Sequence, residues 1–299
     1  MTDPMTRIRR SLAFSIEQAL GAALAQASGG GCPPGLQAAM RYAVFPGGAR
    51  LRPRLCLTVA CACGDDNRLL ADSAAAAIEL LHCASLVHDD LPCFDDAAMR
   101  RGKPSVHEAY GERLAVLTGD ALIVLAFQTL AYAGASAPHR LAPLSLIVAR
   151  AVGAPAGIVA GQAWECESSC SIAEYQRAKT GALFAAATMA GAAAAGANPD
   201  GWRILGERLG EAYQVADDIR DVVSDPKELG KPVGQDEALG RPNAAAELGV
   251  EGARTLLERL LAEAMESIPS SCTDPDGLRA LILMEAQGFL PKHLARMAA

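Results

Sequence analysis

The first residues that could do chemistry are acidic and follow a long apolar run. The stretch 85–96, SLVHDDLPCFDD, places Asp89, Asp90 and Asp95 close together in the sequence. Pro92 disfavours helical dihedrals in the residue before it, so a helix should end there and the chain should turn. Asp89 and Asp90 would then lie in the last helical turn, with Asp95 brought back beside them. Because a helix C-terminus carries partial negative charge, these carboxylates need a nearby cation.

A second acidic group lies further along the chain, in LGEAYQVADDIRDVVSD, where apolar residues recur at helical spacing. Asp217, Asp218 and Asp221 share one face of the predicted helix, and Arg220 is expected to point elsewhere. Like charges at this spacing are destabilising, so a bound divalent cation is the economical explanation. Ligands that are all carboxylate oxygens favour magnesium over zinc.

Basic residues accompany both acidic groups. They are Arg50, Arg52, Arg54, Arg100, Arg101, Lys179 and Lys231. Arginine binds phosphate through two parallel donors, and lysine binds it as a point charge. Two aspartate groups bridged by magnesium, in a cavity walled by such cations, predict a site for two diphosphates.

The elements that position these residues are predicted to be helices. Hydrophobic residues make up 51% of the 299 residues and aromatic residues only 4%, and alanine and leucine dominate long tracts. Alanine loses no side-chain entropy in a helix, so we expect an all-α fold. The only β-like run, RLCLTVACAC, fits a buried helix equally well. No glycine- or proline-rich break is long enough to be a linker, which predicts a single domain over residues 1–299.

Charge and hydropathy narrow the partners. A net charge of -7 and a pI near 5.3 argue against a nucleic-acid partner. No secretory leader is apparent and no run of eighteen apolar residues lacks a charge or a breaker, so we expect a cytoplasmic protein without a membrane span. The nine cysteines are expected to be mostly small buried hydrophobic residues.

Seven segments resemble, in order, the trans-isoprenyl diphosphate synthases of the bacterial farnesyl and geranylgeranyl type. They are GGARLRP, ELLHCASLVHDDLPCFDDAAMRRGKPSVH, LTGDAL, GQAWE, KTGAL, YQVADDIRDVVSD and GKPVGQD. The resemblance covers nearly the whole chain. It implies a single helical bundle around a deep central cavity, the isoprenoid synthase fold, in a homodimer. It also implies isopentenyl diphosphate and an allylic diphosphate as substrates, with three magnesium ions held when substrate is bound.

The resemblance assigns roles position by position. The implied metal ligands are Asp89, Asp90 and Asp95 in the first motif and Asp217, Asp218 and Asp221 in the second. The residues similar to those that hold the allylic diphosphate are Arg100, Lys179, Thr180, Gln214 and Lys231. Those similar to the isopentenyl diphosphate ligands are Arg52, His82 and Arg101. The implied catalytic set is Asp89, Asp90, Asp95, Arg100, Lys179, Asp217 and Lys231.

One position departs from the family pattern. Lysine usually follows the double glycine, whereas Ala49 stands there in this chain. The change removes a cation expected on isopentenyl diphosphate. Arg50 or another residue would have to compensate for it.

Product length should depend on the helix that leads into the first motif. Ala84 and Ser85 lie about 6 to 8 Å before Asp89 at the helical rise of about 1.5 Å per residue, where small side chains leave the cavity deep. Farnesyl-making relatives usually have an aromatic residue at the position of Ala84. The sequence therefore predicts a C20 product, geranylgeranyl diphosphate, with the C15 farnesyl diphosphate as the alternative.

Three other functions fit parts of the sequence. His88-Asp89 also spells the metal-binding pair of HD phosphohydrolases, although the other histidines lack the matching spacing. Class I terpene cyclases share the first motif, but their second motif normally contains Asn, Ser and Glu. A regulatory subunit of a prenyl synthase is suggested by Ala49, although both aspartate motifs are intact.

Overall fold

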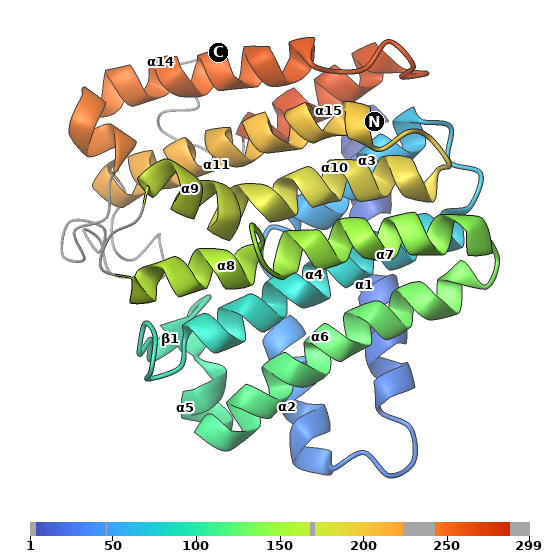
Figure 1. The fold of residues 1–299 in the computed structure, drawn as a ribbon, viewed down its shortest axis with the longest axis vertical. Helices are drawn as coiled ribbons and strands as arrows, with labels where there is room; N and C mark the ends of the chain where they lie inside the picture. Colours follow the sequence, from blue (N-terminus) through green and yellow to red (C-terminus); the bar gives the residue numbers. More distant parts are fainter. Residues whose placement is uncertain (1–3, 46, 168–170, 224–242, 288–299) are drawn as a thin grey trace. The chain divides into compact units, whose positions relative to one another are not determined.

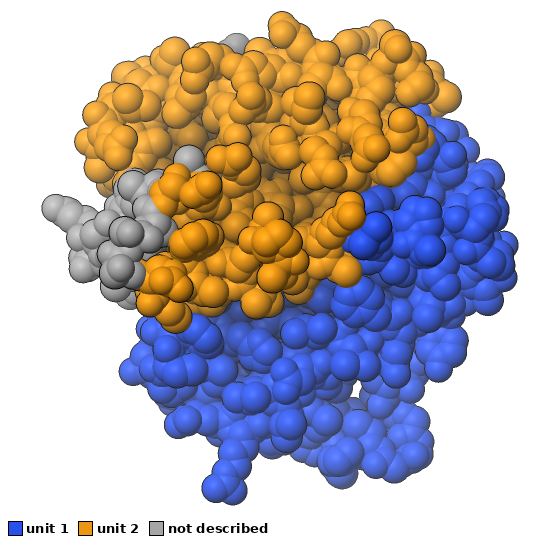
Figure 2. Space-filling view, in the orientation of Figure 1, with its two compact units in different colours: residues 1–148, 190–197 blue, residues 149–189, 198–299 orange. Residues whose placement is uncertain are grey.

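The computed structural model describes residues 4–45, 47–167, 171–223 and 243–287 (Figure 1). Helices dominate the described residues, with one two-stranded sheet of two residues per strand, which confirms the predicted all-α fold. The chain divides into two compact units, coloured separately in Figure 2. Unit 1 is Met1–Val148 with Ala190–Ala197, and unit 2 is Ala149–Met189 with Asn198–Ala299. The single domain over 1–299 stays a prediction.

Unit 1 carries the first aspartate motif. Its elements are α1 (Pro4–Ala27), α2 (Pro34–Val44), α3 (Leu51–Ala62), α4 (Arg68–Asp89), β1 (Met99–Arg100), β2 (Lys103–Pro104), α5 (Val106–Tyr110), α6 (Glu112–Gly134) and most of α7 (Pro138–Val152). Helices α4 and α6 form its most extensive helix pair. Their packing is close, because a Cβ at Gly119 of α6 would overlap the ring of His88 on α4.

Helix α4 positions the first motif because it is buried along most of its length. Asn67 caps its N-terminus by accepting a hydrogen bond from the backbone N–H of Leu70 at 3.1 Å. The helix ends at Asp89, three residues before Pro92, as the sequence predicts. The packed helix therefore fixes the position of Asp89 and Asp90 at its C-terminal end.

Two segments of unit 1 were less clear from the sequence. The ambiguous run RLCLTVACAC lies largely in helix α3. No strand was expected in residues 99–104, which form the antiparallel pair β1–β2. Arg101 and Gly102 connect these strands with φ of 54° and 74°, as a two-residue turn of this kind requires.

Unit 2 carries the second motif. Its elements are α8 (Ile158–Ala163), η1 (Trp164–Cys166), α9 (Ile172–Gln176), η2 (Arg177–Gly181), α10 (Ala182–Ala194, of which the last residues belong to unit 1), η3 (Asp200–Trp202), α11 (Arg203–Val223), α14 (Ala244–Glu266) and α15 (Pro275–Gln287). Helices α11 and α14 run side by side (Figure 1). The η2 segment is a single π-helical turn, a feature that often marks functional sites.

By length and composition alone, two of the described helices could cross a membrane. The most apolar window of α4 is 78% buried inside the protein and that of α6 is 44% buried. Buried core helices pass the same test, so these helices are weak grounds for a membrane span. The expected lack of a span stays a prediction.

The cysteines are more exposed than predicted. Of the eight that the structure describes, only Cys56, Cys83 and Cys272 are buried, while Cys61, Cys93 and Cys166 are exposed. The expectation of mostly buried cysteines was therefore wrong. Cys93 lies in the turn after α4 and Cys166 in the short η1 segment, where composition does not predict burial.

Candidate active site

The first aspartate motif forms the predicted turn. The backbone N–H of Asp95 donates to the carbonyl oxygen of Asp89 at 3.0 Å, and that of Ala97 donates to Asp90 at 3.2 Å. Asp89 is half-buried and Asp95 is exposed. The turn therefore brings the last aspartate of the motif back to the end of α4, as the sequence predicts.

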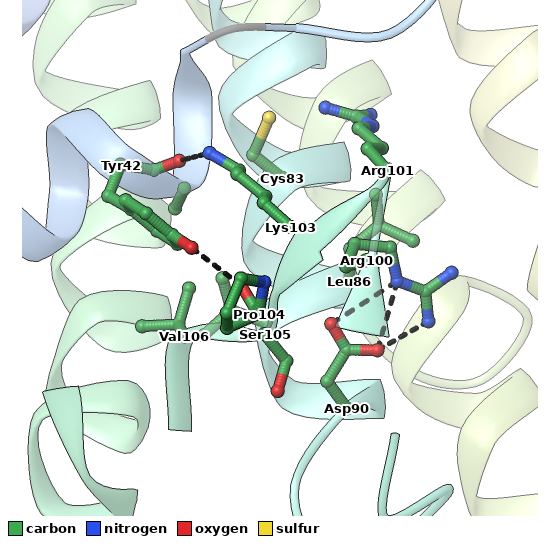
Figure 3. A pocket seen from close by; sticks show the side chains of 12 residues that line it. Tyr42, Cys83, Leu86, Asp90, Arg100, Arg101, Lys103, Pro104, Ser105 and Val106 are labelled. Carbon is green, nitrogen blue, oxygen red and sulfur yellow. Dashed lines mark hydrogen bonds and ion pairs between the residues drawn. The ribbon is translucent and has the colours of Figure 1, made fainter. Parts of the chain in front are cut away.

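Asp90 lies at the C-terminal end of α4, where a nearby cation was expected, and Arg100 provides it. The carboxylate is 2% exposed, and the Nε of Arg100 donates to its two oxygens at 3.0 and 3.2 Å. The Nη2 of the same arginine also contacts Asp90 Oδ1 (Figure 3). Burial raises the pKa of Asp90 above its ordinary value, although the ion pair with Arg100 opposes this shift. Arg100 thus stabilises the carboxylate at the negative end of α4.

A second basic group gathers around His82. Arg52 Nη1 lies 3.5 Å from His82 Nε2. Burial lowers the pKa of His82 well below 6.5, and Arg52 and Arg101 lower it further. The imidazole is therefore neutral near pH 7. The three residues predicted to bind isopentenyl diphosphate thus act on one another within unit 1.

Arg50 does not replace the lysine that Ala49 removes. Its side chain is buried and donates to Glu17 at 2.8 Å and to Glu79 at 2.6 Å. It also donates to the carbonyl oxygen of Val44 at 2.8 Å. The suggestion that Arg50 compensates is wrong, because two carboxylates and a carbonyl already use its donors.

A small pocket lies beside the β1–β2 pair (Figure 3). Arg100 and Arg101 both line it, and Figure 3 shows Arg100 reaching Asp90 while Arg101 extends away from that carboxylate. Arg100 ends strand β1, whereas Arg101 lies in the turn with a positive φ, which sends the two side chains in different directions. Burial raises the pKa of the Cys83 thiol, also in this pocket, to about 11, with Glu79 adding to the effect. The thiol stays neutral, in line with a reaction that needs no cysteine nucleophile.

The two positions predicted to set product length lie on α4. Ala84 is fully buried and Ser85 is half-buried. The Ser85 hydroxyl donates to the carbonyl oxygen of His82 at 2.9 Å, which satisfies it within the helix. Their role as a cavity floor stays a prediction.

In unit 2, the second aspartate motif differs from expectation at Arg220. Its Nη2 lies 2.8 Å from Asp217 Oδ1, one helical turn away. The prediction that this arginine points elsewhere was wrong, because residues three apart on a helix are within reach of each other. Asp217 is half-buried and Asp221 is buried. The ion pair neutralises part of the charge on this face.

Asp218 joins two helices of unit 2. It is 2% exposed, and its Oδ1 accepts from the side-chain amide of Gln214 at 3.0 Å. Its Oδ2 accepts from the backbone N–H of Ala244, at the start of α14, at 2.8 Å. Asn243 caps the same helix. Both carboxylate oxygens of Asp218 therefore hold α11 against the N-terminus of α14.

The predicted allylic diphosphate ligands of unit 2 lie on and beside the π-helical turn. Lys179 Nζ is 2.5 Å from Glu165 Oε1, and the Tyr175 hydroxyl donates to the same oxygen at 2.6 Å. The Thr180 hydroxyl donates to Gln214 Oε1 at 3.3 Å. Lys179, Thr180, Gln214 and Asp218 thus belong to one region. Lys231 lies outside the described residues.

The donor chemistry of both motifs suits magnesium, since every candidate ligand is a carboxylate oxygen. Within the described ranges, no three His, Cys, Asp or Glu side chains are already arranged to hold a metal ion. Asp90 and Asp218 explain part of this, because their oxygens accept hydrogen bonds from protein donors. That the two motifs face each other stays a prediction, as do the individual ligand roles.

Sequence reasoning missed several residues that support the site. Glu165 and Tyr175 hold Lys179, and Lys103 contacts the end of α2. The GQAWE segment was a signal for Glu165, because it was already part of the resemblance. Nothing local marked Asn243, whose side-chain amide lies 3.4 Å from the carbonyl oxygen of Asp218.

Comparisons with known proteins agree with this architecture. The model of the polyprenyl synthetase family matches residues 33–272. A geranylgeranyl diphosphate synthase of Cereibacter sphaeroides is 55% identical over 280 residues, which cover 94% of this chain and 97% of that protein. The enzyme of the same name from Rhodobacter capsulatus is 54% identical over 87% of this chain and 90% of its own. A solved geranyltransferase from Helicobacter pylori, complexed with magnesium and isoprenyl diphosphate, is 29% identical with a TM-score of 0.75 and covers 95% of this chain and 98% of its own. The chain is a member of the polyprenyl synthetase family.

Proposed function

We propose that the protein is a magnesium-dependent trans-prenyltransferase that condenses isopentenyl diphosphate with allylic diphosphates to geranylgeranyl diphosphate. The observation that carries the proposal is the pair of intact aspartate motifs, each beside cations, in a chain that is 55% identical to a geranylgeranyl diphosphate synthase. Family membership favours this function over the phosphohydrolase and terpene cyclase alternatives.

We assign the two diphosphates to two sets of residues. Arg52, His82 and Arg101 would hold the diphosphate of isopentenyl diphosphate. Arg100 and Lys179 would hold the allylic diphosphate and stabilise the charge that develops on it as it leaves. Lys231 would act with them. The allylic carbocation is then attacked by the double bond of isopentenyl diphosphate, and a proton is lost to the released diphosphate.

Magnesium would be held by the aspartates of both motifs, with three ions when substrate is bound. Bound there, it supplies Lewis-acid stabilisation of the diphosphate oxygens. The protein contributes carboxylates fixed at the end of a packed helix in each unit. It also has to exclude water, since water would quench a carbocation.

The C20 product follows from the small side chain of Ala84. Replacing it, as Ala84→Phe, should shorten the product to farnesyl diphosphate, because an aromatic ring would fill the path of the growing chain. Chromatography of the dephosphorylated products measures this. An unchanged product would remove Ala84 from the floor of the cavity.

The central experiment incubates the purified protein with magnesium, labelled isopentenyl diphosphate and each allylic primer in turn, followed by product sizing. A C20 alcohol after dephosphorylation supports the proposal. A C15 end product would assign a farnesyl diphosphate synthase instead. No product alone, but product with a partner synthase, would assign a regulatory subunit, the alternative that Ala49 suggests.

A homodimer in the cytoplasm completes the proposal. Helix α6 offers apolar side chains to the surface of the described structure, and these are Val116, Leu117, Val124 and Tyr132. A second copy of the chain would cover them. Light scattering of the wild-type protein and of Val124→Glu tests this, with a dimer expected for the former and weakened association for the latter.

A further inference from the structure

A connected group of side chains outside the predicted ligands is centred on Lys103. Its Nζ donates to the carbonyl oxygens of Tyr42 at 2.5 Å and Phe45 at 2.9 Å. These carbonyls belong to the last turn and the C-cap of α2, where the helix dipole favours a cation. Lys103 therefore fixes the point at which the chain leaves α2.

Tyr42 strengthens the same contact from the other side. Its hydroxyl donates to the carbonyl oxygen of Pro104 at 2.8 Å, and its ring lies 3.7 Å from the Lys103 ammonium. Its ring also meets that of Tyr110 edge-on, with centroids 5.3 Å apart. We call these contacts of Lys103 and Tyr42 the Lys103 clamp. Three hydrogen bonds and a cation–π contact thus join strand β2 to the end of α2. Figure 3 shows the two of these hydrogen bonds that involve Tyr42.

The clamp also bears on Arg101, one of the predicted isopentenyl diphosphate ligands. Arg101 lies two residues before Lys103 in the turn between the strands. Its guanidinium lies 3.1 Å from where a Cβ of Gly48 would stand. Gly48 belongs to the chain that leaves α2 at Phe45 and continues to Arg52 on α3. The β1–β2 pair therefore meets this chain at two places: Lys103 hydrogen-bonds it at the end of α2, and Arg101 lies close to Gly48.

We propose that Lys103 is a positioning residue that sets the place of Arg101 relative to Arg52 and so determines the affinity for the diphosphate of isopentenyl diphosphate. This rests on the proposed function. The ammonium of Lys103 contacts two carbonyl oxygens and the ring of Tyr42. We therefore expect Lys103 to affect substrate binding indirectly, through the position of Arg101. A fixed clamp matters more in this chain because Ala49 supplies no cation of its own.

The test is a KM series measured with saturating amounts of the other substrate. Lys103→Met keeps the length of the side chain and removes its donors, and it should raise the KM for isopentenyl diphosphate about tenfold, because small misplacements of binding groups are costly. The KM for the allylic primer and kcat should stay within about twofold of wild type. Lys103→Arg should restore most of the affinity.

Two further variants separate positioning from other roles. Tyr42→Phe carries no charge change and removes only the bond to Pro104, so a rise of about two- to threefold in the same KM is expected. Arg259→Met removes an exposed cation of α14 and is the matched control, with unchanged kinetics expected. Circular dichroism and thermal melting show whether each variant is folded.

Several outcomes would overturn the proposal. An unchanged KM for isopentenyl diphosphate in folded Lys103→Met would do so, as would an equal loss in both KM values and kcat, which indicates a structural role alone. An effect of Lys103→Met with none of Tyr42→Phe would indicate direct contact between lysine and substrate. If the wild type makes no product, the proposed function fails, but the role of Lys103 can still be tested. Calorimetry would then compare the binding of isopentenyl diphosphate to wild type and to Lys103→Met, with weaker binding expected in the variant.

Discussion

In both aspartate motifs the second aspartate is buried, but its carboxylate interacts with different kinds of donor. Asp90 and Asp218 are each the second aspartate of their motif, and each is 2% exposed. Asp90 faces the guanidinium of Arg100, whereas Asp218 accepts hydrogen bonds from an amide and a backbone N–H. Asp90 thus meets the full charge of Arg100, and Asp218 meets the neutral donors of Gln214 and Ala244.

The comparison indicates that the second aspartate of each motif has a structural role. The second aspartate of each motif therefore supports the local structure in addition to the metal-binding role predicted for it. In unit 1 this support comes from the strand that follows the motif. In unit 2 it comes from the start of a helix more than twenty residues later.

The largest effect should come from removing the first aspartate of each motif. Asp89→Asn and Asp217→Asn should each lower kcat by about 10²–10³-fold, because each removes a charge that would hold the metal at the developing negative charge. The magnesium concentration for half-maximal rate should also rise. Asp96→Asn, an exposed aspartate of the same turn, is the control and should behave as wild type. A large loss in only one of the two variants would show that the motifs are not equivalent partners in metal binding.

The next effect concerns stability and distinguishes the two buried carboxylates. Asp90→Asn should lower the free energy of unfolding by about 1–3 kcal/mol, because the Arg100 guanidinium loses its charged partner. Urea unfolding without metal measures this. Removing both charges, in Asp90→Asn with Arg100→Gln, should restore part of the loss. If Asp90→Asn unfolds at the wild-type urea concentration, the ion pair contributes nothing to the fold.

Asp218→Asn should cost less, about 0.5–1.5 kcal/mol, because the donors that Gln214 and Ala244 offer it are neutral and an amide oxygen can still accept one of these hydrogen bonds. The same urea experiment measures it. Hydrogen exchange at the start of α14 should increase, since the N–H of Ala244 loses its acceptor or shares a weaker one. A cost for Asp218→Asn above that of Asp90→Asn would reverse the comparison.

The smallest expected effect is a pH dependence of the affinity for isopentenyl diphosphate, which is predicted to bind at Arg52, His82 and Arg101. In the free protein, burial and Arg52 lower the pKa of His82 well below 6.5, so the imidazole is neutral near pH 7. A bound diphosphate favours the charged imidazole and raises this pKa, so binding takes up a proton. The affinity for isopentenyl diphosphate should therefore fall as pH rises from the lowered pKa of the free protein to the higher pKa of the complex.

The measurement is the KM for isopentenyl diphosphate between pH 5.5 and 8, in wild type and in His82→Gln. The ratio of the two KM values cancels the effect of protonation of the diphosphate itself, because both proteins bind the same substrate. A ratio that does not change with pH would mean that His82 takes up no proton on binding. The KM for the allylic primer should show no such difference, because His82 is not among the residues predicted to hold the allylic diphosphate.

Much of the fold was predictable because its signals are local. Alanine-rich tracts and the prolines gave the helices and the end of α4, and the turn at Asp89–Asp95 follows from Pro92. The β1–β2 pair was not predicted, since two-residue strands have no periodicity to detect. Helix α3 was ambiguous because a fully buried run looks the same in either structure.

The site was predictable to the extent that residue types reveal chemistry. The motifs and their cations are visible in the sequence, whereas the partners of each charge are not. Arg50 and Arg220 show this: one is used by Glu17 and Glu79, and the other pairs with Asp217. A guanidinium can serve a ligand or a carboxylate equally well, and only the three-dimensional arrangement decides between them.

The π-helical turn at Arg177–Gly181 makes one part of unit 2 unusually sensitive to deletions. Such a turn contains an extra residue, and each residue rotates a helix by about 100°. Loss of the single codon for Ala178 would restore regular winding and swing α9 around its own axis relative to α10. Tyr175 would then move away from Glu165, so a change in helical phase alone would weaken the support of Lys179 while leaving Glu165 and Tyr175 themselves unchanged.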